Sequence, residues 1–284
     1  MRKILKNEMC LICGKNSTWT KVTSLPGFIF GKRAEIAKCS QCGCAKTIPP
    51  PVSLELYENN NRYVELFTEK RAIYAKYSGD ILSVLDGLMD PHGRKLLDVA
   101  SGGGFLVEVA KARGYAAEGV ELNREMVSWC KGRGLNVHHA DALDFLASCE
   151  PYDVIVLSSI IEHLEDPIKL IEACRKALKP GGMILVSQAI FNGLLPVIFP
   201  WGWYGWQPKE HHWHFTDKSL VALFQSLGFE VIQSKRFSLH HPWFFYGGIK
   251  NLVGRNVAAI LARVAILIGR EDGYLLVVKV KDSL

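Results

Sequence analysis

The chain has 284 residues, of which 49% are hydrophobic and 22% charged, a balance that excludes a disordered or collagen-like protein. Its length fits one large domain, or one ordinary domain with a small one beside it. No apolar run reaches the roughly 18 residues of a membrane-spanning helix, and residues 1–8 lack the apolar core of a signal peptide. We therefore expect a cytoplasmic protein.

The net charge of +6 is concentrated at the start of the chain. Residues 1–50 hold nine lysines and arginines but only two acids, whereas the remaining residues sum to −1. Such a basic head fits a solvated surface, and it also fits docking to nucleic acid or another anionic partner.

Two CxxCG motifs lie in this basic head, at Cys10 and Cys13 and again at Cys39 and Cys42. The spacing lets two thiolates grip one ion from a tight turn, and two such turns complete a tetrahedral zinc site with four cysteine ligands. Four cysteines leave no open position on the ion, so the zinc is expected to be structural. The pattern predicts a zinc ribbon over residues 1–48.

The other cysteines have no such spacing. Cys44 is expected to be left over from the zinc site. Cys130, Cys149 and Cys174 fall in or beside expected helices, where cysteine is usually a small buried residue.

A run of three prolines, residues 49–51, marks the boundary to a second domain over residues 49–284. The apolar spacing over 54–89 predicts an amphipathic helix. Strands and helices then alternate, which predicts a parallel sheet with helices on both faces. The strands are expected at 95–100, 116–120, 135–139, 153–157, 183–187, 229–233 and 274–280, and helices at 105–112, 124–132, 167–178 and 218–227.

A glycine-rich loop follows the first of these strands. It runs from Asp98 through Ala100 to Gly104, and such a loop lets a ligand approach the backbone at a helix N-terminus. Glu121 ends the next strand, where an acid can bind the two ribose hydroxyls of a nucleoside. The third strand is followed by Asp141 and Ala142, which can face an adenine ring.

Two further motifs complete the series, Glu162-His163-Leu164 after the fourth strand and Lys179-Pro180-Gly181-Gly182 before the fifth. The series resembles class I S-adenosylmethionine (SAM)-dependent methyltransferases, in the branch of ubiquinone-pathway O-methyltransferases and many sugar or natural-product methyltransferases. The resemblance covers about residues 60–284. It implies a Rossmann-like seven-stranded sheet with one antiparallel strand, and SAM as the cofactor.

The resemblance also implies where SAM binds. Asp98 and the loop would hold its methionine end, with the Ser158 backbone at the ammonium group and Glu121 at the ribose. Adenine would meet the side chains that follow the second and third strands. The full set is Asp98, Ala100, Ser101, Gly102, Gly104, Glu121, Leu122, Met126, Asp141, Ala142 and Ser158. Ala100 stands where the family usually has glycine, so we expect the turn to avoid positive φ there.

Three histidines are candidates for binding the substrate or removing its proton, because imidazole titrates near neutral pH. His163 follows the fourth strand, at the sheet edge where such folds bind ligands. By resemblance, His211 lines the pocket ahead of a Phe-Thr helix cap, and His214, in the same cluster, is a further candidate for the pocket lining. Each also fits a purely structural role, and a metal site made of these histidines is a weaker alternative.

Two segments depart from a simple alternation. Residues 189–215 are rich in glycine, proline and aromatic residues and are expected to form a lid over the substrate. Residues 240–272 form an insertion with an apolar stretch too short to cross a bilayer. In order of expectation it is a buried helix, a homodimer surface or a membrane-touching face.

Methylation of a small molecule, on oxygen or carbon, is the first functional hypothesis, with a sugar nucleotide, a quinone-like compound or a natural product as substrate. The alternative is an RNA methyltransferase that docks through the basic zinc ribbon. Against it, no Asn/Asp-Pro-Pro-Tyr motif follows the fourth strand and aromatic residues are few in the ribbon. A non-enzymatic SAM sensor is the third hypothesis.

Overall fold

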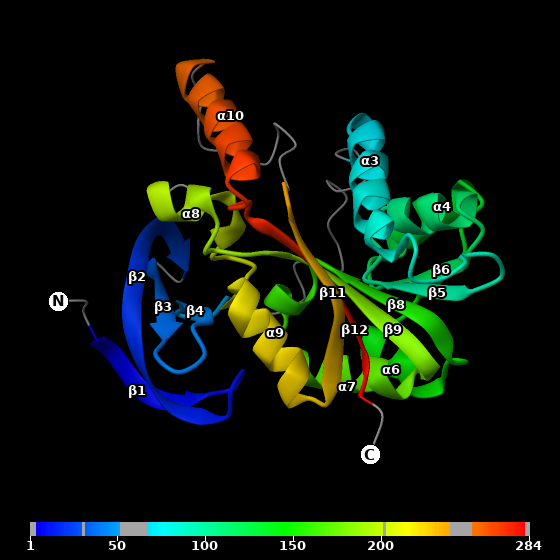
Figure 1. Ribbon diagram of the computed structural model, residues 1–284, viewed down its shortest axis with the longest axis horizontal. Helices are drawn as coiled ribbons and strands as arrows, with labels where there is room; N and C mark the ends of the chain where they lie inside the picture. The colour runs from blue at the N-terminus through cyan, green and yellow to red at the C-terminus, as the bar shows by residue number, and fades with distance from the viewer. Residues whose placement is uncertain (1–3, 30–31, 52–66, 201–202, 239–251, 282–284) are drawn as a thin grey trace.

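The computed structural model describes residues 4–29, 32–51, 67–200, 203–238 and 252–281 and contains two sheets (Figure 1). The smaller sheet is antiparallel, with the order β1-β2-β3-β4-β10. Four of its strands come from the start of the chain, and β10 comes from more than 160 residues later. Its strands are β1 (Ile4–Cys10), β2 (Lys15–Ile29), β3 (Lys32–Cys39), β4 (Ala45–Ile48) and β10 (Trp213–His214).

The larger sheet has seven strands in the order β11-β12-β9-β8-β5-β6-β7. Only β12 runs antiparallel to its neighbours, which confirms the predicted Rossmann-like methyltransferase sheet. The strands are β5 (Lys95–Val99), β6 (Ala116–Glu121), β7 (Val137–His139), β8 (Tyr152–Ser158), β9 (Leu178–Ala189), β11 (Phe229–Phe237) and β12 (Gly273–Val280).

Helices cover both faces of this sheet and pack against two buried apolar clusters (Figure 1). Local sequence explains where they begin. Asn123 accepts hydrogen bonds from the backbone N–H groups of Glu125 and Met126, and Thr216 forms a capping box with Ser219. The helices are α3 (Arg71–Leu82), α4 (Phe105–Ala112), α5 (Arg124–Gly132), α6 (Ala142–Ser148), α7 (Pro167–Lys176) and α9 (Asp217–Ser226).

Several boundaries differ from the expected ones. Within the described residues the helix expected over 54–89 is α3, continued by a short turn to Leu85, while 52–66 lie outside the described residues. The expected helix over 167–178 ends at Lys176, because β9 already begins at Leu178. Helix α6 was not predicted, because its seven residues are too few for a clear apolar period.

Two helices come from the segments that interrupt the alternation. They are α8 (Leu194–Ile198) and α10 (Leu252–Leu267), and they contact each other at one end of the molecule (Figure 1). The expectation that residues 240–272 form a buried helix is wrong for the described part of α10, because Ile260, Ile266 and Leu267 are exposed. None of the described helices is long and apolar enough to cross a membrane.

Candidate active site and cysteine cluster

Two cavities lie at the carboxyl ends of the central strands and share part of their lining. The larger, about 440 Å³, is lined by the β5 loop, the end of β8, α3 and the segment before β10. The smaller, about 340 Å³, lies beside it over the ends of β6 and β7. Phe67, Ala100, Gly102 and His163 line both. This is the edge at which doubly wound sheets bind ligands.

The loop after β5 turns through left-handed backbone. Ala100 has φ +57°, so the expectation that it avoids positive φ is wrong. Gly102 and Gly104 also have positive φ, at +50° and +66°. The turn brings the Ser101 N–H to the Val120 carbonyl at 3.0 Å, which ties the loop to β6. The geometry of the turn therefore overrides the preference of alanine.

Glu121 anchors the same loop from β6. One carboxylate oxygen accepts a hydrogen bond of 2.8 Å from the Gly102 N–H, and the other accepts one of 2.8 Å from the Asn123 N–H. Glu121 lines the smaller cavity. Asp98 lies buried next to it, and burial together with the Glu121 charge raises the pKa of Asp98 to about 8.

The other residues predicted to bind SAM divide between the two cavities. Leu122, Met126, Asp141 and Ala142 line the smaller one. Asp98, Ser101 and Ser158 line the larger one, and Ala100 and Gly102 line both. Gly104 lines neither and instead forms the N-cap of α4. Asp141 also caps α6, through hydrogen bonds from Leu143 and Asp144 to one carboxylate oxygen.

His211 lies buried in the wall of the larger cavity. Its Nδ1 is 2.9 Å from the carbonyl oxygen of Gly205. A carbonyl only accepts, so Nδ1 carries the proton and Nε2 keeps a lone pair. Burial holds the pKa of His211 well below 6.5, and the ring is therefore neutral at pH 7.

Two further groups stand against His211. The ring of His163 meets it edge-on with 4.5 Å between centroids, and burial lowers the pKa of His163 to about 4. Glu162 is buried, which raises its pKa to about 7. Its Oε2 has no hydrogen-bond partner among the described residues. A carboxylate oxygen of Glu162 and one ring nitrogen each of His163 and His211 lie within 4.8 Å of one another, a spacing at which these atoms could also hold a metal ion.

His214 lies apart from the cavities, and neither lining includes it. It is buried, and its Nε2 is 2.9 Å from the Thr47 hydroxyl of β4. The same hydroxyl donates to the backbone carbonyl of His211 at 2.7 Å, so the ring nitrogen must donate to Thr47. Burial lowers the pKa of His214 to about 3.

Sequence reasoning missed several residues of this site. The role of Thr47 could not be predicted from the sequence around it, because its hydrogen-bond partners lie more than 160 residues away along the chain. Glu162 adjoins a predicted residue, and an acid directly before His163 was the available signal. Tyr74 and Tyr77 fit ordinary helix positions in the sequence, but both line the larger cavity, where the Tyr77 hydroxyl lies 3.0 Å from that of Ser187.

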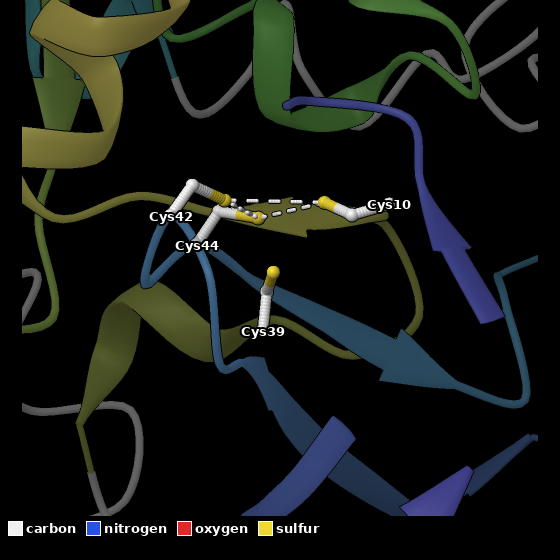
Figure 2. Close-up of side chains that lie close together, drawn as sticks. All are labelled: Cys10, Cys39, Cys42 and Cys44. Carbon is white, nitrogen blue, oxygen red and sulfur yellow. Dashed lines mark hydrogen bonds between the residues drawn. The ribbon is translucent and has the colours of Figure 1, made fainter. Parts of the chain in front are cut away.

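Four cysteine sulfurs converge between β1 and the turn that joins β3 to β4 (Figure 2). They belong to Cys10, Cys39, Cys42 and Cys44, and all lie within 4.8 Å of one another. The sulfur atoms of Cys42 and Cys44 are 3.2 Å apart, those of Cys10 and Cys44 3.6 Å, and those of Cys10 and Cys42 3.9 Å. Zinc held tetrahedrally at about 2.3 Å places its sulfur ligands about 3.8 Å apart, so this donor set fits a zinc ion.

The membership of this group differs from the expected ligand set. Cys44, expected to be left over, contributes a sulfur, and Cys13 is half-buried and outside the group of four. The reason is the tight turn between β3 and β4, which folds the chain back so that the Cys39 N–H donates to the Cys44 carbonyl at 2.8 Å. Cys130 and Cys174 are buried as expected, and Cys149 is half-buried.

Comparison with known proteins agrees with this architecture. Residues 69–234 match the family model described as a methyltransferase domain, which is more than half of the chain. The ubiquinone biosynthesis O-methyltransferase of Idiomarina loihiensis is 35% identical over 48% of this chain and 59% of that protein. The enzyme of that name from Cereibacter sphaeroides is 27% identical over 71% of this chain and 84% of its own length.

Among solved structures, a SAM-dependent methyltransferase from Archaeoglobus fulgidus has the same fold. It superposes with a TM-score of 0.56 at 22% identity and covers 76% of this chain and 99% of its own. The family match, the strand order and the glycine-rich loop agree with one another. The chain therefore belongs to the methyltransferase domain family and is a SAM-dependent methyltransferase.

Proposed function

We propose that the chain methylates a small molecule, with a hydroxyl oxygen as the preferred acceptor. The observation that carries this proposal is the neutral imidazole of His211. Its Nδ1–H donates a hydrogen bond to the Gly205 carbonyl, and Nε2 therefore remains a proton acceptor in the wall of the larger cavity. A hydroxyl must lose its proton when it is methylated, and a positioned imidazole accepts one. The relatives described above are O-methyltransferases, which favours oxygen over carbon.

SAM supplies an activated methyl group when it is bound. In this proposal the smaller cavity takes the adenosine, with Glu121 at the ribose and Asp141 near the adenine. Asp98, the loop from Ala100 to Gly104 and the Ser158 backbone take the methionine end. Because the larger cavity adjoins that end, a substrate there would meet Glu162, His163 and His211.

The three predicted histidines take different roles. His211 accepts the substrate proton, and His163, whose ring meets it edge-on, contacts the substrate. His214 has a structural role, because its ring forms a hydrogen bond with Thr47 outside both cavities and thereby holds the segment that carries His211. The lid over residues 189–215 would thus be held from the side of the smaller sheet.

The cysteine cluster is proposed to hold a structural zinc ion in a ribbon over residues 1–48, beside a methyltransferase domain over 49–284. The donor set supports this, since sulfur atoms at these spacings surround a volume that suits the ion. Cys10, Cys39 and Cys42 are common to the predicted ligands and the observed group. The fourth zinc ligand is either Cys13, as the spacing predicts, or Cys44, as the observed group of sulfurs favours.

The proposal is tested with methyl-labelled SAM, the purified zinc-loaded protein and a cell extract, with and without RNase. We expect label in a small product that RNase leaves intact, and NMR of the purified product to show a methyl bound to oxygen. The variant His211→Asn keeps a donor toward Gly205 but offers no imidazole lone pair. It serves as the matched control and should yield little product.

Other outcomes would contradict the proposal in distinct ways. Label in large, RNase-sensitive material would establish the RNA alternative. A product with the methyl bound to carbon would agree with a small-molecule methyltransferase but would contradict a hydroxyl oxygen as the acceptor. SAM binding without transfer to any extract or to simple hydroxylated aromatics would favour a SAM sensor.

A further inference from the structure

Exposed apolar side chains gather on one side of the molecule. Among the described residues, eleven large apolar side chains are exposed, and seven of them lie on α8 or on α10 and the turn after it. Leu267 is 83% exposed, and Ile260 and Val197 are each 58% exposed. We call this set the outer apolar patch: Val197, Ile198, Ile260, Val264, Ile266, Leu267 and Ile268.

Over residues 260–267, the part of α10 whose side chains the structure describes, the burial pattern is inverted relative to that of an ordinary surface helix. The buried positions there are the small Ala262 and Ala265, while large side chains such as Ile260 and Leu267 face outward. Leu261, between these faces, packs against the cluster that contains Trp203 and Trp206. A helix that only covered the core would bury its large apolar residues. The outward face is therefore built to be covered by something else.

In the sequence, the segment that contains α10 carries charges of one sign. From residue 238 to residue 270 the sequence has no aspartate or glutamate and has four basic residues, Lys250, Arg255, Arg263 and Arg270. Arg263 is exposed on α10 between the patch residues Ile260 and Val264. A symmetric contact with a second copy would bring these cations against one another with no acid of this segment to offset them. An anionic surface complements them.

The same segment has the composition of an interfacial anchor. Four aromatic residues, at 243–246, precede α10 in the sequence. The helix has 16 residues, and α10 projects from the end of the sheet next to α8 (Figure 1). A helix that combines an apolar outer face with basic residues lies in the plane of a lipid headgroup layer rather than across it.

We propose that the outer apolar patch binds the surface of a membrane that contains anionic phospholipid, with α10 lying in the headgroup region. This inference does not depend on the acceptor or on the chemistry proposed above. It rests on the exposed side chains of α8 and α10 and on the basic sequence segment without acids that contains α10.

The test is flotation of the purified full-length protein with vesicles of phosphatidylcholine alone and of phosphatidylcholine mixed with phosphatidylglycerol. We expect binding to the mixed vesicles, weakened by salt, and much less binding to phosphatidylcholine alone. The double variant Ile260→Glu, Leu267→Glu should weaken binding at least about tenfold, because it places charge on the inserted face. Arg263→Glu should reduce the preference for phosphatidylglycerol.

The control is Ile232→Glu, which adds one glutamate at an exposed apolar position on β11, away from the patch, and is compared with Ile260→Glu and Leu267→Glu made singly. It should bind vesicles like the native protein, and all variants should retain the native melting temperature. Absence of binding to either vesicle, or equal loss in the control, would overturn the proposal. So would a patch variant that changes a dimer to a monomer while the native protein ignores vesicles, since a second copy would then cover the patch.

Discussion

At the scale of single residues, the loop after β5 shows a conflict between a side chain and its backbone. Ala100 occupies left-handed backbone at φ +57°, a conformation that costs a non-glycine residue about 1–2 kcal/mol. The sequence motif revealed the loop and its place before α4, since glycines and an acid at the right spacing are local features. It could not reveal the sign of φ at Ala100, which the contact of Ser101 with Val120 on β6 imposes.

This strain gives a first prediction. Ala100→Gly should raise the free energy of unfolding by about 1 kcal/mol, because glycine adopts positive φ without a steric penalty. Urea denaturation at equilibrium measures the change. The control Ala110→Gly, in the middle of α4, should lower stability by at least about 1 kcal/mol. A loss of stability in Ala100→Gly would show that the turn is not strained by the methyl group.

Glu121 gives the second prediction. Its carboxylate both fixes Gly102 and faces the smaller cavity, so Glu121→Ala should weaken SAM binding at least about tenfold. Isothermal titration calorimetry measures the affinity. Glu118→Gln, on the same strand but bonded to Tyr152 and His138, should leave the affinity within about twofold. Unchanged affinity in Glu121→Ala would remove the ribose assignment.

At the scale of elements, the pairing of β4 with β10 joins the first strands of the chain to the segment between β9 and α9. Trp213 lies opposite Lys46 and His214 opposite Ala45, and the Thr47 N–H donates to the His212 carbonyl at 3.0 Å. Hydrophobic periodicity predicted most strands of the large sheet, because their apolar runs are continuous and local. A two-residue strand such as β10 carries no period, so its partner could not be predicted.

We therefore predict that Thr47 positions the segment that carries His211 and His214. Thr47→Val keeps the shape but removes the hydroxyl that bonds His211 and His214, so kcat should fall by about tenfold or more while SAM affinity stays unchanged. Steady-state kinetics and calorimetry separate the two effects. Thr47→Ser, which restores the hydroxyl, should recover most of kcat. If the serine variant is as slow as the valine variant, the hydroxyl does not act in this way.

At the scale of the whole molecule, the small sheet and the methyltransferase sheet share one buried cluster. Cys10 and Trp19 belong to it together with Leu157 and Phe224. The motif spacing predicted that the cysteines gather, because CxxCG turns are local. It did not predict that Cys44 joins them, since that depends on how β3 and β4 close their turn.

Metal content distinguishes the two candidate ligand sets. We expect Cys39→Ser to lose bound zinc and to melt at a lower temperature, because a structural zinc ion contributes directly to folding. Metal analysis by mass spectrometry, with calorimetry, measures both. If Cys44 is the fourth ligand, Cys44→Ser should lose zinc and Cys13→Ser should retain it, and the reverse pattern would identify Cys13. Retention of one ion per chain by Cys39→Ser would contradict a cysteine site.

The place of β10 in the small sheet has a consequence for synthesis on the ribosome. Strands β1 to β4 are made before β10, and β4 can pair with its second neighbour only when residues 213–214 have been made. The Thr47 hydroxyl likewise has no access to its acceptor, the His211 carbonyl, until a further 164 residues have been added. Until then the nascent chain exposes an open strand edge, which is a template for pairing with other chains. The small sheet is thus begun by strands that are translated before the methyltransferase sheet and is completed only after most of that sheet has been made.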